Sequence, residues 1–222
     1  IASLLSSAAL LHCLTCANLT ASPLFLFPVS GYLGFLHPFP SRRSSALAPE
    51  AIGYYTGLNK VWLGVIEGMT ELSNNGEVSR MVSAYVNFLQ GKERAGVERA
   101  VLANTFARDS FGKGMYRKFG SLVSEQETYA RVFLSLASEQ ASQFYSQTMR
   151  SPLVDEVEKM RQAAFDKANE GGFGVDSGQW FKTQTGKINL LKTVEDKLSG
   201  FMIERIDALH AEAYSALAFY LV

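Results

Sequence analysis

The sequence predicts an all-α fold in which long antiparallel helices form one or two helical bundles. After residue 50, apolar residues recur at intervals of three and four, and alternating runs of β-branched residues, which would indicate strands, are missing. The helical stretches are long, and the loops between them are short and contain glycine, asparagine or proline. Long helices joined by short loops are typical of antiparallel bundles.

Charge is distributed unevenly along the chain. The 222 residues carry 21 basic and 21 acidic side chains, a balance that argues against a nucleic-acid-binding protein. Residues 1–50 hold only three of these charges and five of the six prolines. We therefore divide the chain into an atypical, charge-poor segment, 1–50, with a helix over 1–19, and a helical-bundle domain, 51–222.

The bundle domain is expected to contain five helices. The first covers 52–72 and ends at an Asn-Asn-Gly loop, and the second runs from about 77 to 110, where two glycines follow. One long third helix is expected over 115–148. Ser151 and Pro152 then provide an N-cap and a first helical residue for a fourth helix that ends near 168.

The last helix is expected to begin after Asp176, which forms a capping box with Gln179, and to run for about 40 residues. Its apolar stripe starts at Ile188 and continues at bundle spacing to Ala213. Residues 213–222 carry no charge. They predict either a core-facing helix end or the first half of a membrane-spanning helix, which needs about 20 apolar residues.

A charged run, 92–99, lies inside the second helix, downstream of an apolar stripe that includes Tyr85 and Phe88. At about 100° per residue, Lys92, Gly96 and Arg99 continue the stripe, whereas Arg94 and Glu98 fall on the far side and predict a surface ion pair. A buried cation costs several kcal/mol unless it is paired. Its partner is either a carboxylate from another helix or a small anion.

The order and spacing of four segments resemble the nitrate- and nitrite-sensing (NIT) domain of bacterial receptors. The segments are 92–107, 125–133, 157–161 and 174–198. The resemblance implies an all-helical sensor of chemoreceptors, histidine kinases, cyclases or antitermination regulators, which binds its anion through arginines on long core helices. One family motif maps onto Lys92, Glu93, Gly96, Glu98 and Arg99. A second family motif, in the first helix, is incomplete: 30–34 resemble its tail, but 25–29 hold no charge, so its arginine is absent.

Arg99 is the main candidate for a ligand-binding residue, because a planar guanidinium can donate two parallel hydrogen bonds to a planar anion such as nitrate or nitrite. Gly96 would leave room for the anion, and Lys92 would supply a second charge. Arg94 is a further candidate, although its position favours a structural role. The structural alternative pairs Arg99 with a carboxylate such as Glu125 or Glu98.

Three other features are interpreted as structural. Trp180 and Phe181, at the start of the last helix, are expected to plug the core beneath the 169–175 loop. Arg161 is expected to be a solvated charge. Cys13 and Cys16 form a C-x-x-C pair on the predicted 1–19 helix without a strand–helix unit beside it, so no redox or zinc site is expected.

No motif for a catalytic nucleophile, a phosphate loop or a zinc protease is present, so we expect neither enzymatic activity nor a cofactor. The first hypothesis is a bacterial sensor domain that binds nitrate or nitrite, dimerises, and passes a conformational shift to a methyl-accepting, kinase or cyclase domain. Its expected location is extracytoplasmic, in an inner-membrane receptor, with a cytoplasmic location as the alternative. The second hypothesis is a structural or dimerisation bundle that binds no small molecule.

Overall fold

The computed structural model describes residues 53–54, 57–61, 63–65, 68 and 75–220. The expectations for residues 1–50, including the 1–19 helix and the C-x-x-C pair, lie outside the described residues. Within the predicted first helix, every described residue from 53 to 68 is helical. Between 75 and 220 the chain forms five helices and no strand: α4 (Gly76–Arg108), α5 (Met115–Leu136), α6 (Glu139–Thr148), α7 (Pro152–Asp166) and α8 (Ser177–Tyr220).

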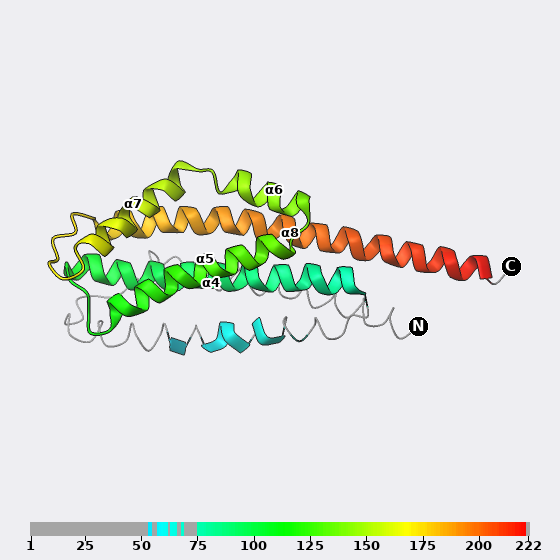
Figure 1. Cartoon of the computed structure of the whole chain (residues 1–222), viewed down its shortest axis with the longest axis horizontal. Coiled ribbons are helices and arrows are strands. Elements are labelled where there is room, and N and C mark those ends of the chain that lie inside the picture. Colours follow the sequence, from blue (N-terminus) through cyan, green and yellow to red (C-terminus); the bar gives the residue numbers. More distant parts are fainter. Residues whose placement is uncertain (1–52, 55–56, 62, 66–67, 69–74, 221–222) are drawn as a thin grey trace, which may run out of the picture.

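These helices form an antiparallel bundle, as the sequence predicts (Figure 1). α5 runs antiparallel to α4. α6 and α7 then run in the direction of α4, and α8 runs in the direction of α5. Together, α6 and α7 occupy the place of one long helix. The C-terminal part of α8, drawn in red, extends beyond the other described helices.

The single helix predicted over 115–148 is wrong, because the structure separates it into α5 and α6. Ala137 is extended, with ψ of 152°, and Ser138 caps α6 by accepting a 3.2 Å hydrogen bond from the backbone N–H of Ala141. Glu139 follows in the first turn, where the helix dipole favours negative charge. The serine followed by an acid is an N-terminal signal that the apolar periodicity concealed.

The predicted helix starts are confirmed by their caps. Asp176 Oδ1 accepts from the backbone N–H of Gln179 at 2.7 Å, and Ser151 Oγ accepts from that of Leu153 at 3.4 Å. At the start of α4, Asn75 Oδ1 accepts from the backbone N–H groups of Glu77 and Val78, at 2.9 and 3.2 Å. Each cap satisfies donors that the helix itself leaves without partners.

We expect Asn75→Ala to lower the free energy of unfolding by about 1 kcal/mol, the usual cost of losing an N-cap side chain. Both N–H groups that Asn75 caps would lose their protein acceptor. Asn75→Asp is the matched control, since it keeps the acceptor and places a negative charge at the positive end of the helix. Urea denaturation of the three proteins measures the effect, and equal midpoints for the alanine variant and the unmodified chain would contradict it.

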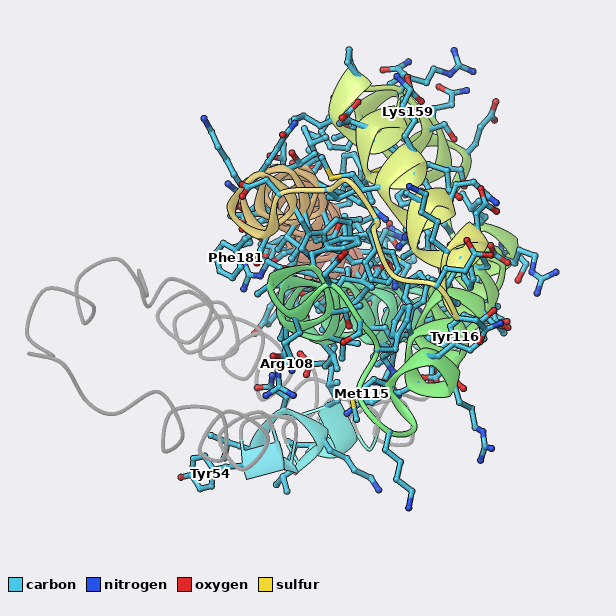
Figure 2. The ribbon with its side chains drawn as sticks, turned by 90° about the vertical axis from the view of Figure 1, so that its left-hand side faces the viewer. Tyr54, Arg108, Met115, Tyr116, Lys159 and Phe181 are labelled. Atoms are coloured by element: carbon cyan, nitrogen blue, oxygen red, sulfur yellow. The ribbon has the colours of Figure 1, made fainter. Side chains whose placement is uncertain are left out.

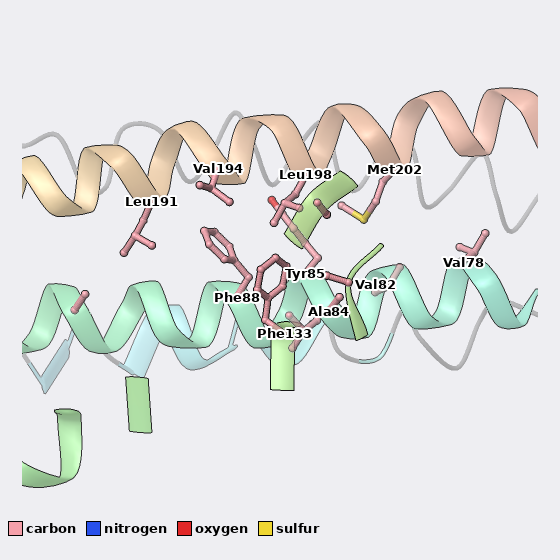
Figure 3. Packing of buried hydrophobic residues seen from close by; sticks show 14 of the residues in the cluster. Val78, Val82, Ala84, Tyr85, Phe88, Phe133, Leu191, Val194, Leu198 and Met202 are labelled. Carbon is pink, nitrogen blue, oxygen red and sulfur yellow. The ribbon is translucent and has the colours of Figure 1, made fainter. Parts of the chain in front are cut away.

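Two apolar clusters form the core. The first lies mainly between α4 and α8, with Phe133 of α5 reaching it (Figure 3). The second lies toward the other end of α4, where Leu102 and Phe106 pack with Phe119 of α5, Val157 of α7 and Trp180 of α8. The predicted stripe of α4 is buried in the first cluster. On α5, Val132 is 36% exposed although Phe133 beside it is fully buried.

The end of α8 is not a core-facing helix end in this chain, because the described side chains from 211 onward are exposed. Tyr214 and Phe219 are among them. Among the described helices, none has an apolar stretch long enough to cross a bilayer.

Candidate functional site

A layer of buried charged and polar side chains lies between the two apolar clusters. We call it the polar layer and define it as the following residues, of which Gln126 is half-buried and the others are buried: Lys92 and Glu98 of α4, Gln126 of α5, Arg161 of α7, and Gln184, Lys187 and Glu195 of α8. It lies where the charged run of α4 passes the first half of α8. Four helices therefore contribute to it, and the sequence predicts only Lys92 among its buried members.

Glu98 and Arg161 form the centre of the polar layer. Glu98 is 0% and Arg161 6% exposed, and the guanidinium donates from Nε to Oε1 and from Nη2 to Oε2, both at 2.6 Å. Burial alone would lower the pKa of Arg161, but its hydrogen bonds and ion pairs with Glu98 and Glu158 raise it. The predictions of a solvated Arg161 and a surface Glu98 are both wrong. The reason is that α4 packs against α5 as well as α8, so more than one face of α4 is buried in the core.

Two amides complete the environment of the Glu98 carboxylate. Gln126 Nε2 donates to Oε2 at 2.9 Å, and Gln184 Nε2 donates to the same oxygen at 3.1 Å. Gln184 also donates to the carbonyl of Ala95, and Arg161 Nη2 donates to Gln126 Oε1. The buried ion pair is thus held by hydrogen bonds from three helices, which is the condition under which buried charges are tolerated.

Lys92 is buried as the sequence predicts, and its partner is a carboxylate. Its Nζ forms an ion pair with Glu195 of α8, which is itself fully enclosed. Lys192 lies on the outer side of the same carboxylate, with Nζ 3.9 Å from Oε1. The charge of Lys92 is therefore already balanced within the protein.

Arg94 pairs with Glu125 rather than with Glu98, so the predicted surface pair is wrong. Its Nε donates to Glu125 Oε2 at 2.7 Å, its Nη1 donates to Gln90, and its guanidinium lies 5.3 Å from the ring centroid of Tyr129. These contacts join α4 to α5. They favour a structural role for Arg94.

Arg99 is half-buried between α4 and α8, and among the described residues no carboxylate lies within ion-pair distance of it. Its Nη1 donates to Thr185 Oγ1 at 2.8 Å, and its guanidinium lies 4.6 Å from the ring centroid of Phe181. Burial lowers the pKa of Arg99. The structural alternative that pairs Arg99 with Glu125 or Glu98 is contradicted, because these carboxylates bind Arg94 and Arg161.

Trp180 and Phe181 have different environments. Trp180 is fully buried, as predicted, and its Nε1 donates to the carbonyl of Arg99 at 3.0 Å, which fixes this turn of α4. Phe181 is 37% exposed and stacks on Arg99, so its prediction as a core plug is wrong. Figure 2 shows Phe181 on the side of α8 that is turned away from α7, where Lys159 is labelled. Gly96, one turn before Arg99, is partly exposed.

Lys187 is the member of the polar layer that sequence reasoning missed most completely. It is 7% exposed, and burial together with the charge of Arg161 lowers its pKa to about 8, against the opposing charges of Glu98 and Glu158. The spacing of residues along α8 indicates that Lys187 is buried. Gln184, Lys187 and Leu191 are three and four residues apart, so they share one face of α8 with the apolar stripe.

Long helices that enclose a charged layer define the class of this protein as a helical-bundle domain. The chain belongs to the NIT family, since the family model described as nitrate and nitrite sensing matches residues 40–203. The match confirms the resemblance found in the sequence. It covers all of α4 to α7 and most of α8.

Two relatives agree with this assignment. The chain is similar to the nitrate regulatory protein of Klebsiella oxytoca, with 26% identity over 168 residues, which are 76% of this chain and 42% of that protein. Among solved structures it is similar to the NasR transcription antiterminator, with a TM-score of 0.61 and 26% identity, over 67% of this chain and 40% of that chain. The chain thus spans about two fifths of the length of each relative.

Proposed function

We propose that this chain is the ligand-sensing domain of a bacterial signal-transduction protein and that it binds nitrate or nitrite at Arg99. Family membership supplies the class of ligand. We assign the site from the environment of Arg99. It is half-buried and lacks a carboxylate among the described residues, whereas Lys92, Arg94 and Arg161 each have one.

The contacts of Arg99 suit it to hold a planar anion. Thr185 and Phe181 fix the guanidinium, and among the described residues only its Nη1 has a hydrogen-bond acceptor. The remaining N–H groups can donate in parallel to two oxygens of nitrate or nitrite. Partial burial strengthens such bonds, because fewer waters compete for them. Gly96 would leave space for the anion, whereas the charge of Lys92, two turns before Arg99, is neutralised by Glu195.

Binding at Arg99 would act on the packing of α4 against α8, because the residue belongs to α4 while both its partners belong to α8. An anion that neutralises Arg99 would favour one packing of these helices over another. α8 is 44 residues long and extends beyond the bundle, so it could carry the shift to an output domain (Figure 1). We propose that the domain acts as a homodimer.

The output and the location of the full-length protein are part of the same proposal. A receptor in the inner membrane, with a methyl-accepting, kinase or cyclase output, is one candidate. A regulator with an antitermination output is the other, because the matched solved structure is that of a transcription antiterminator.

Calorimetric titration with nitrate, with a chloride control, tests the proposed site. We expect Arg99→Met to weaken nitrate binding by about tenfold or more, because hydrogen bonds to charged groups contribute about 1.5–3 kcal/mol. Arg94→Met is the matched control on the same helix, and we expect it to leave affinity nearly unchanged, since Arg94 is committed to Glu125. An unchanged nitrate affinity in Arg99→Met would show that Arg99 does not bind the anion.

A second candidate function, a structural or dimerisation bundle without a small ligand, rests on one observation. Residues 25–29 lack the arginine that the family motif places in the first helix. The same titration separates the two candidates. A lack of saturable nitrate binding by the unmodified chain would favour the structural role.

A further inference from the structure

A cavity of about 150 Å³ adjoins the polar layer. One part of its wall is cationic and polar and contains Lys92, Gln126, Arg161 and Lys187. A water occupies about 30 Å³ in the liquid, so the cavity has room for a few waters or one small ligand.

Another part of the cavity wall is apolar. It contains Phe88 of α4, Ala130 of α5 and Leu191 of α8, and the ring of Tyr145 from α6 adjoins them. Figure 3 shows Phe88 and Leu191 on the facing sides of α4 and α8. A ligand that fills this cavity therefore meets a charged wall and a hydrocarbon wall.

The cations around the cavity outnumber the buried carboxylates that pair with them by one. Lys92 is balanced by Glu195, and Arg161 is balanced by Glu98. Glu158 also lies 3.3 Å from Nη1 of Arg161, but its side chain is 63% exposed, so solvent screens its charge. Lys187 has no ion pair and no hydrogen bond to any described residue. Gln184 Oε1, one turn earlier on α8, is buried and has no donor among the described residues, so it is not the partner of Lys187.

An unpaired ammonium in a buried position is unfavourable and normally acquires a partner or loses its proton. One negative charge placed in the cavity would balance Lys187. Glu127 also lines the cavity, but it is exposed to solvent, so its charge is screened and does not replace a buried counter-ion.

We propose that this cavity is an anion site separate from Arg99 and that it binds a small monocarboxylate, such as acetate or propionate. The carboxylate would contact the ammonium of Lys187, and the hydrocarbon end would pack between Phe88 and Leu191. A single negative charge matches the single excess cation. An inorganic anion would leave the apolar wall without a partner.

The two sites occupy different sides of α8. Arg99 contacts α8 through Phe181 and Thr185, while Lys187 is two residues beyond Thr185 and so about 200° around the helix. The carboxylate site does not depend on the proposed nitrate site. Each can be tested, and can fail, without the other.

The test is calorimetric titration of the whole chain with sodium acetate and sodium propionate at constant ionic strength, followed by sodium nitrate. The variants are Lys187→Met, Lys182→Met as the matched control on an exposed position of α8, and Arg99→Met. Methionine keeps the apolar stem of the lysine, so the bundle should fold without its charge.

We expect saturable carboxylate binding by the unmodified chain, Lys182→Met and Arg99→Met, and at least tenfold weaker binding by Lys187→Met. Nitrate binding should be unaffected by Lys187→Met. Three results would each overturn the proposal: no saturable carboxylate binding by the unmodified chain, equal binding by Lys187→Met, or loss of nitrate binding in place of carboxylate binding in that variant.

Discussion

Arg161→Met is expected to lower the free energy of unfolding by about 3–5 kcal/mol, the usual cost of removing one partner of a buried ion pair. Glu98 would remain 0% exposed, with only the amides of Gln126 and Gln184 to satisfy its carboxylate. Two hydrogen bonds of 2.6 Å to Arg161 would be lost. Urea denaturation followed by circular dichroism measures the change.

Two further variants show whether the loss comes from an unpaired buried charge. The double variant Glu98→Met with Arg161→Met removes both charges, and we expect it to recover most of the lost stability. Arg94→Met breaks the more exposed pair with Glu125 and should cost only about 0–1 kcal/mol. A single variant Arg161→Met as stable as Arg94→Met would show that Glu98 reaches solvent or another partner.

Lys187→Met is expected to stabilise the bundle in the absence of ligand. The pKa of Lys187 is lowered from 10.5 to about 8 by burial and by Arg161, so the folded state disfavours the charged form. A difference of this size corresponds to roughly 3 kcal/mol at pH 7, where both the folded and the unfolded states carry the proton. This figure is an upper bound, because methionine also changes the packing around the cavity.

The same group gives the stability of the unmodified chain a distinct dependence on pH. Below about pH 8 Lys187 is charged in the folded state, and its burial then lowers the free energy of unfolding by the full amount. Between about pH 8 and 10.5 the unfolded state binds more protons than the folded state, so this contribution to stability rises with pH. We expect the rise to be absent in Lys187→Met and retained in Lys182→Met. Parallel profiles for all three proteins would show that Lys187 is not the group responsible.

Periodicity was sufficient for the fold class, and together with loop and capping residues it predicted most helix bounds. A stripe at three- and four-residue spacing marks one buried face, and Ser151 and Asp176 cap helices at the positions where the sequence places caps. The break at Ser138 was missed because apolar residues keep helical spacing across it. There the Ser138 hydroxyl accepts a hydrogen bond from the backbone N–H of Ala141 and so starts a new helix.

The candidate site was only partly predictable. Lys92 and Arg99 follow the stripe, and the structure buries one and half-buries the other. Glu98 lies off the stripe and is nevertheless buried, because α5 and α7 cover that face. A one-stripe pattern describes a helix at the surface of a bundle, and α4 has several core faces instead.

By itself, the sequence determined that this protein is an all-helical NIT-family domain with a charged run inside a core helix. Helix period and caps depend on residues close together in the chain, and the order of the family motifs can be read along it. Only the tertiary structure decided which charges are paired. Glu98 with Arg161 and Lys92 with Glu195 are 63 and 103 residues apart, and sequence spacing carries no information about which distant helices meet. The same packing leaves Lys187 without an ion-pair partner among the described residues.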